Sequence, residues 1–150
     1  MERSPRKIQS KNIITKHLHR YEVKHGPITV FVHDNTNSKD WRTITAFTKN
    51  ASVAELSDFG SIIHIEGLDN PVYYFNRIKA KLKFEGTGEG KALMIEVCKL
   101  ADKRGITILN ELNPYGKRDM ESLKEFFEAS GFKEFNDNNT MVRKPKVKNE

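Results

Sequence analysis

The sequence predicts a mixed α/β domain, in which a sheet is covered by helices, on three observations. Segments rich in β-branched and aromatic residues occupy much of the first half of the chain. The second half runs strand, glycine loop, helix, strand, helix and strand. The first of these helices must cross over between two strands of one sheet, which makes those strands parallel. The length of 150 residues suits one domain with its own core.

Four segments of the chain have the composition of strands before the glycine loop. ITVFVHD at 28–34 is rich in β-branched residues, and RTITAFT at 42–48 alternates apolar and polar residues. SIIHIEGL at 61–68 and VYYFNRIKA at 72–80 are separated by the turn sequence DNP. We therefore expect the last two segments to pair as a hairpin.

Helical spacing is clearest after the glycine loop. Apolar residues follow one face of a helix over 89–104, two basic residues lie in its last turn, and Gly105 ends it. ITILNEL at 106–112 is the next strand, and 120–130 is a second helix that Gly131 stops. This order places the helix 89–104 between two parallel strands.

Three other segments are less regular. Residues 7–23 have loosely helical spacing of apolar residues, and we expect a short helix there. AELSDFGS, at 54–61, is expected to be a short helical or irregular passage. FKEF and TMVRK, near the end of the chain, are expected to form a final short strand or pair.

The net charge of +6 comes from the two ends of the chain. Residues 1–25 carry seven Lys or Arg and two Glu, and 143–150 carry four Lys or Arg and one Glu, so 26–142 has a charge of −2. We therefore expect residues 1–150 to form a single domain with a basic N-terminal extension and a basic C-terminal tail. Solubilising ends are favoured over ends that contact nucleic acid.

Several classes of protein are disfavoured by composition. No apolar run approaches the ~20 residues that span a bilayer, and the charged N-terminus lacks the apolar stretch of a secretory signal. The single cysteine, Cys98, cannot form an internal disulfide, which fits the cytoplasm. His17, His19 and His25 lack the spacing of a metal site, so we expect no metal.

The glycine loop in KFEGTGEGKALMIEV, at 83–97, predicts a phosphate-binding site. Free amides and the positive end of the dipole at a helix N-terminus attract anions, and glycines remove the Cβ atoms that would block them. A Walker A loop is rejected, because Glu85 stands at its first glycine and Ala92 at its hydroxyl. A dinucleotide loop is less favoured, since Lys91 replaces its third glycine and one β-α-β unit follows.

EGTGEGKALM resembles the acyl-CoA loop of the GNAT (Gcn5-related) N-acetyltransferase superfamily, Arg/Gln-x-x-Gly-x-Gly/Ala, and here reads Glu85-x-x-Gly88-x-Gly90. Downstream, FFEASGF is similar to the family's segment before its last strands, and TMVRK to its usual last strand. The resemblance covers residues 72–144. The NPYG and MVRKP segments look like those of small members encoded by bacteriophages.

The resemblance implies a GNAT fold: a mixed, mostly antiparallel sheet with splayed parallel central strands and flanking helices. Acetyl-CoA would be the cosubstrate, with its pantetheine arm lying between the two splayed strands. Main-chain groups of the first strand would pair with that arm, and loop amides would hold the diphosphate. The implied cofactor-binding residues are Ile78, Lys79, Ala80, Gly86, Thr87, Gly88, Glu89, Gly90, Lys91 and Asn113.

The implied reaction is direct attack of a primary amine, on a protein or a small molecule, on the thioester. Glu111 is the first candidate for the base and Glu66 the second, and Tyr115 is the candidate acid. Two departures from the family pattern are Phe127 at a position where tyrosine is frequent and Glu85 in place of Arg or Gln. The alternative is therefore a weakly active or non-catalytic GNAT-fold protein whose basic ends bind a host protein or nucleic acid. Either would be a monomer or a homodimer.

Overall fold

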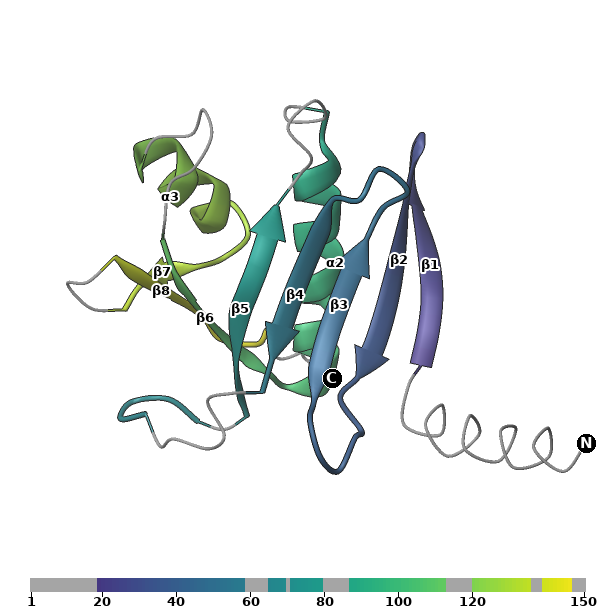
Figure 1. The fold of residues 1–150 in the computed structure, drawn as a ribbon. Helices are drawn as coiled ribbons and strands as arrows, with labels where there is room; N and C mark the ends of the chain where they lie inside the picture. The colour runs from purple at the N-terminus through teal and green to yellow at the C-terminus, as the bar shows by residue number, and fades with distance from the viewer. Residues whose placement is uncertain are drawn as a thin grey trace, which may run out of the picture.

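The computed structural model describes residues 19–58, 65–69, 71–79, 87–112, 120–135 and 139–146. These residues contain two helices and the eight strands of one sheet, in the order β1-β2-β3-β4-β5-β6-β8-β7 (Figure 1). The elements are β1 (His19–His25), β2 (Ile28–Asn35), β3 (Thr43–Phe47), β4 (Val53–Ser57), β5 (Val72–Lys79), α2 (Glu89–Arg104), β6 (Thr107–Glu111), α3 (Met120–Glu128), β7 (Lys133–Glu134) and β8 (Thr140–Arg143).

The sheet is mostly antiparallel, with one parallel pair near its centre. Strands β1 to β5 follow one another in antiparallel order, and β5 then pairs with β6 in parallel after α2 crosses over. The parallel ladder has three residue pairs, from Val72 with Thr107 to Tyr74 with Leu109. Because β5 continues to Lys79 without a β6 partner in the described chain, the two strands part beyond Tyr74. The fold class predicted from the sequence is confirmed.

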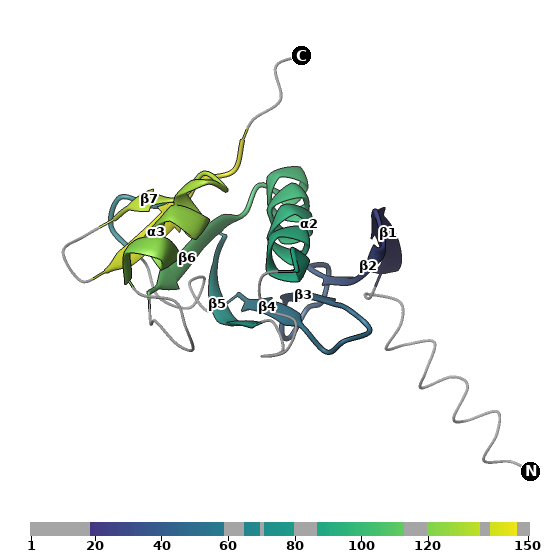
Figure 2. The same cartoon turned by 90° about the horizontal axis from the view of Figure 1, so that it is seen from above.

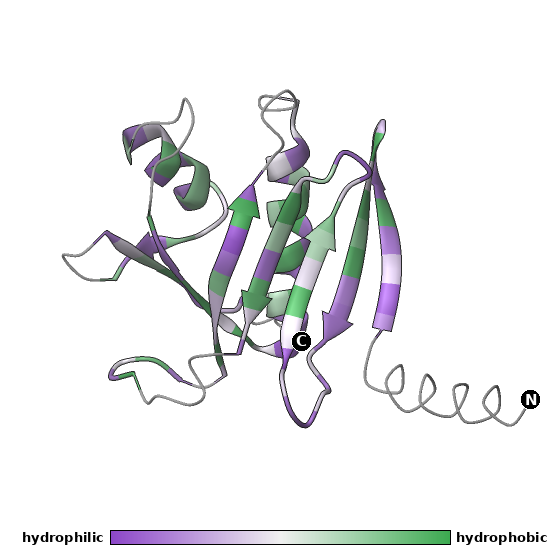
Figure 3. Cartoon of the chain, in the orientation of Figure 1, coloured by the Kyte–Doolittle hydropathy of each residue, from purple (hydrophilic) through white to green (hydrophobic). Residues whose placement is uncertain are grey.

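The main core lies between α2 and one face of the sheet (Figure 2). Strands β2, β3 and β4 alternate between buried and half-buried residues, so one side of each strand faces α2, and Figure 3 shows the matching alternation of hydropathy. From the helix, Leu93, Met94 and Val97 are fully buried against these strands. The sheet therefore positions α2 along its whole length.

A smaller apolar cluster covers the opposite face of β5 and β6. Leu68, Val72, Leu109 and Val142 are buried there, with Tyr74 among the half-buried residues packed against them. Alternate residues of a strand point to opposite faces, so β5 and β6 are covered on both sides. This second face is also the one that carries Glu111, two residues after Leu109.

The helix predicted at 7–23 is wrong for the residues that the structure describes. Residues 19–23 belong to β1, which pairs with β2 from His19 to His25, while 7–18 lie outside the described residues. The two strands are joined by a tight turn in which Gly26 has a φ of 61°. The spacing of apolar residues in this segment is compatible with a helix. Its described residues form a strand instead, because they pair with β2 along its length.

The region between β3 and β5 also differs from the prediction. AELSDFGS was expected to be helical or irregular, yet Val53–Ser57 is a strand paired on both sides. SIIHIEGL was expected to pair with β5, but that place is taken by β4. Residues 65–68 form a turn, in which the Leu68 amide donates to the Ile65 carbonyl at 3.1 Å, and 61–64 lie outside the described residues.

The second half of the chain follows the prediction closely. Helix α2 has the predicted bounds, and Gly105 ends it in the left-handed conformation with a φ of 68°. Helix α3 ends at Glu128, two residues before the predicted limit, and Gly131 follows it with a φ of 98°. Strands β7 and β8 form the expected short pair.

Candidate active site

The N-terminus of α2 has no side-chain cap among the described residues. Gly88 is its N-cap, with a φ of 92° that favours glycine, and makes no side-chain hydrogen bond to the first turn. The first amides of a helix have no acceptor within it, and the dipole places a partial positive charge there. Lys91 is exposed in the first turn of α2. The described part of the predicted glycine loop, residues 87–91, therefore has the features of a phosphate site.

Glu89 is the acidic residue of this first turn, and its side chain is turned into the protein. The carboxylate accepts hydrogen bonds from Thr48 Oγ1 at 2.9 Å, Asn50 Nδ2 at 2.6 Å and Ser52 Oγ at 2.5 Å. Burial alone would raise the pKa of Glu89, but these three hydrogen bonds outweigh it and lower the pKa. The charged carboxylate is thus held by the turn between β3 and β4.

Strand β5 runs toward this end of α2. One edge of β5 pairs with β4, where Ile78 lies opposite Ala54 and Lys79 opposite Val53. The other edge has lost β6 by this point, because the parallel ladder stops at Tyr74. Main-chain groups on that edge beyond Tyr74 therefore have no β6 partner among the described residues.

A β-bulge in β5 accompanies the separation of the two strands. Phe75 lies opposite Leu56 and Arg77 opposite Glu55, so Asn76 is the extra residue. Its side-chain oxygen accepts a hydrogen bond from Ser57 Oγ at 3.1 Å. A bulge bends its strand and increases the twist, which favours divergence from β6.

Two candidate bases lie over the same face of the sheet. Glu111 is the exposed last residue of β6, pairs with Thr140 on β8 and shares a face with Leu109. Glu66 is exposed in the 65–68 turn, not on a strand as predicted, and that turn packs on the cluster that includes Leu109. Tyr74, from β5, is half-buried in the same cluster. Glu111 stands where the parallel strands have parted.

Phe127 is a core residue. It is 1% exposed and packs edge-on against Phe75, Phe126 and Phe132. The position at which the resembling family often has a tyrosine is therefore part of the core in this chain. Four of the predicted site residues, Ala80, Gly86, Asn113 and Tyr115, lie outside the described residues.

Two further findings concern other kinds of site. Among the described residues, no group of three His, Cys, Asp or Glu side chains is arranged to hold a metal ion. No helix of the described chain has both the length and the apolar character needed to cross a bilayer.

The comparisons with known proteins point to one fold. The sequence matches no family model and has no significantly similar curated protein. The structure is similar to the crystal structure of the ribosomal-protein-S18-alanine N-acetyltransferase from Escherichia coli, with a TM-score of 0.52 and 14% identity. The match covers 77% of this chain and 76% of that chain. The GNAT fold implied by the glycine loop is thus confirmed.

Proposed function

We propose that this protein is an N-acetyltransferase that moves the acetyl group of acetyl-CoA to a primary amine. The observation that carries the proposal is the parting of β5 and β6 beyond Tyr74 and Leu109, beside the uncapped N-terminus of α2. A gap between two strands accepts an extended arm with amide groups, and a helix N-terminus accepts a diphosphate. Coenzyme A contains both.

The coenzyme would be held mainly by the backbone. Main-chain groups of Ile78, Lys79 and Ala80 would pair with the pantetheine amides, and amides from Gly86 to Lys91 would hold the diphosphate. The exposed Lys91 side chain adds a charge-assisted contact to a phosphate oxygen. Asn113, after β6, is the remaining candidate contact. Bound acetyl-CoA supplies an activated acyl group.

Side chains of the protein would accept and donate the protons of the reaction. Glu111 takes a proton from the acceptor ammonium, and the freed amine nitrogen attacks the thioester carbonyl carbon. The C–N bond forms as the C–S bond breaks, and the thiolate leaves with a proton from Tyr115. The nitrogen gives up its second proton as the amide forms, and this proton returns Tyr115 to its neutral state. Glu66 is the second candidate for the base. Phe127 has no proton to give, so the acid must come from another position.

The acceptor is proposed by chemistry alone. Any unprotonated primary amine can attack a thioester, so protein N-termini, lysines and small amines all qualify. The structural neighbour acts on an alanine of ribosomal protein S18, by its name. A peptide that begins with alanine is therefore the first acceptor to test. We propose a cytoplasmic location, where acetyl-CoA is available and the buried Cys98 thiol stays reduced.

The test is release of coenzyme A thiol from acetyl-CoA in the presence of an amine panel. We expect turnover with at least one amine, and a loss of about 100-fold or more in kcat for Glu111→Gln. Glu121→Gln, an exposed carboxylate on α3, is the matched control and should leave turnover unchanged. Tyr115→Phe should slow the reaction by a comparable factor.

The alternative is a GNAT-fold protein that binds a partner through its basic ends without catalysis, and the buried Phe127 favours it. It predicts no turnover with any amine, and nucleic-acid binding that weakens with salt and disappears when residues 1–25 are deleted. Absence of any calorimetric signal with both acetyl-CoA and coenzyme A would overturn the proposal itself.

A further inference from the structure

A second site is suggested at the opposite end of α2. A cavity of about 280 Å³ lies where the loop after β2, the end of β4, the start of β5 and the end of α2 meet. Polar residues that line it include Thr36, Arg42, Asp58, Tyr73 and Arg104. Helix α2 has 16 residues, so the cavity is roughly 24 Å from the glycine loop at a rise of 1.5 Å per residue.

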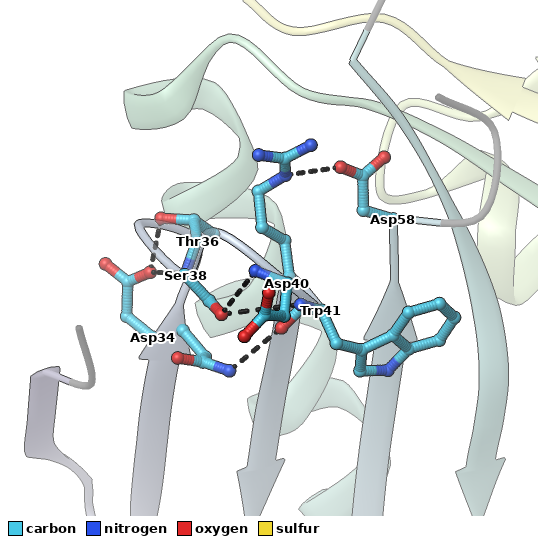
Figure 4. Close-up of polar contacts among 8 residues, drawn as sticks. Asp34, Thr36, Ser38, Asp40, Trp41 and Asp58 are labelled. Carbon is cyan, nitrogen blue, oxygen red and sulfur yellow. Dashed lines mark hydrogen bonds and ion pairs between the residues drawn. The ribbon is translucent and has the colours of Figure 1, made fainter. Parts of the chain in front are cut away.

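One wall of the cavity has its hydrogen bonds satisfied. Asp34 Oδ1 accepts from the Thr36 amide at 3.0 Å and from Thr36 Oγ1 at 2.6 Å (Figure 4). Asp34 Oδ2 accepts from Arg104 Nη2 at 2.8 Å and from Arg104 Nε at 3.3 Å. Both oxygens of this aspartate therefore have donors, and the carboxylate has a structural role.

The other wall is incomplete. The Asp58 side chain is only 3% exposed, and its Oδ2 accepts from Arg42 Nε at 2.6 Å (Figure 4). Its Oδ1 is buried and has no hydrogen-bond donor in the described chain. A buried carboxylate oxygen that has no donor destabilises the fold, because the oxygen has lost its hydration and gained no hydrogen bond in return. Native structures contain few such atoms. A donor from outside the chain would satisfy it.

Arg42 offers the complementary chemistry beside this oxygen. Its Nε donates to Asp58, the side chain is 44% exposed, and its two Nη groups bond to none of the described residues, so they can face an acceptor at the cavity. The Asp58 amide also donates to the Arg42 carbonyl at 2.9 Å, which fixes the two residues against each other. A guanidinium edge matches a carboxylate with two parallel hydrogen bonds.

We propose that this cavity binds a small zwitterion, a free α-amino acid. Arg42 holds its carboxylate, and its ammonium donates to Asp58 Oδ1. The two binding groups are adjacent, as are the two charges of an α-amino acid. The volume lies at the lower limit of ligand pockets, roughly 300 Å³, which excludes a nucleotide. The arginine beside the carboxylate disfavours a metal cation.

Tyr73 closes the inner side of the cavity. The residue is 1% exposed, and burial, together with the Asp58 carboxylate, raises the pKa of its hydroxyl. It therefore stays protonated at neutral pH and serves as a neutral polar group beside the ligand.

Trp41 provides a reporter for the test. It is the one tryptophan of the chain, is 48% exposed and precedes Arg42. Titration of the full chain with glycine, alanine, serine and glutamate should give a saturable change in its fluorescence for at least one of them. Arginine Nε–H signals in NMR spectra give a second readout, which does not depend on Trp41.

Ligands that carry only one of the two charges, together with variants of the two binding residues, identify the groups that bind. Acetate carries only the anion and alaninamide only the ammonium, and each should bind at least about tenfold more weakly than the best amino acid. Arg42→Gln and Asp58→Asn should both weaken that amino acid by a similar factor. Lys103→Gln removes an exposed charge near Arg104 and should change nothing.

Either of two results would overturn the proposal. One is the absence of saturation in both readouts with every amino acid tested up to high millimolar concentration. The other is equal binding of acetate and the amino acids, since this would show a simple anion patch. Thermal unfolding of each variant verifies that it is folded, and Arg42→Lys, which keeps the charge and loses the bidentate edge, supplies a milder variant.

Discussion

Carboxylates are held by different kinds of donor at the two ends of α2. At the N-terminal end, Glu89 accepts hydrogen bonds from three neutral donors and from no arginine of the described residues. Near the C-terminal end, Asp34, Asp58 and Asp102 each accept from an arginine. The difference follows the helix dipole, because cations are favourable at the negative end and anions at the positive end.

The contrast also bears on the proposed anion site. Neutral donors hold the Glu89 side chain within the protein, so its carboxylate does not occupy the site proposed at the first turn of α2. Arg143 donates to both carboxylate oxygens of Asp102, at 2.8 and 3.0 Å, so each of these oxygens already has a donor. Asp58 is the exception at this end, since one oxygen has no donor among the described residues. A satisfied carboxylate is structural, whereas an unsatisfied one points to a ligand.

The largest expected effect is at the arginine-paired end. Arg143 is 3% exposed and bonds to Asp102 and to the Ser130 carbonyl, so Asp102→Ala leaves a buried cation without its partner. We expect the free energy of unfolding to fall by about 3 kcal/mol, measured by urea unfolding at pH 7. Lys103→Ala, an exposed neighbour, is the control. A loss below about 1 kcal/mol would show that the pair is not needed.

Glu89→Ala is the matching change at the other end. Three donors lose their common acceptor in a site that is 5% exposed, and we expect a loss of about 2 kcal/mol in the same urea experiment. Glu89→Gln keeps the volume and one acceptor oxygen, so its loss should be smaller. If both variants match Lys91→Ala, at an exposed position of the same turn, the hydrogen bonds do not stabilise the fold.

Removing the donors instead of the acceptor tests what the neutral cluster does for ligand binding. Thr48→Val with Ser52→Ala leaves Asn50 as the remaining donor of the three, so the Glu89 carboxylate can turn toward the bound diphosphate, which it repels. We expect calorimetry to show coenzyme A binding about fivefold more weakly, from roughly 1 kcal/mol of repulsion between exposed charges. Adding Glu89→Gln should restore the affinity. Unchanged affinity in the double variant would mean that Glu89 stays in place without these donors.

Stability should also depend on pH through Glu89. Its pKa is lowered in the folded protein, so its contribution is present above the unfolded value of 4.5 and is lost as the pH falls through the folded value. Between pH 6 and pH 3 Glu89→Gln should therefore lose less stability than the natural chain. The pH dependence of stability that remains in Glu89→Gln comes in part from Asp34 and Asp102, whose pKa values are also lowered. Parallel curves for the two proteins would contradict this assignment.

The smallest effect is expected at Asp58. Its partner Arg42 is 44% exposed and its second oxygen has no donor, so Asp58→Asn removes one half-exposed ion pair. We expect a loss of under about 1 kcal/mol in urea unfolding, less than for Asp102→Ala. A larger loss than for Glu89→Ala would place Asp58 among the structural carboxylates and weaken its assignment as a ligand group.

The sequence alone determined the parts of the fold that depend on neighbours along the chain. Helix α2 has the predicted bounds because its apolar spacing and the glycines at its two ends are local signals. The same holds for β2, β3 and β5, whose composition is typical of strands. The glycine loop and its helix also identified the candidate coenzyme site.

Only the tertiary structure decided which distant segments meet. Strands β1 and β4 were missed because β1 is polar at most positions and the VAELS sequence of β4 is as compatible with a helix as with a strand. Both become strands through their partners, and the local sequence does not encode where those partners lie. Glu89 meets donors 37 to 41 residues away, and Arg42 meets Asp58 across 16 residues. Periodicity carries no information on such contacts, since burial and pairing arise only when the sheet closes around α2.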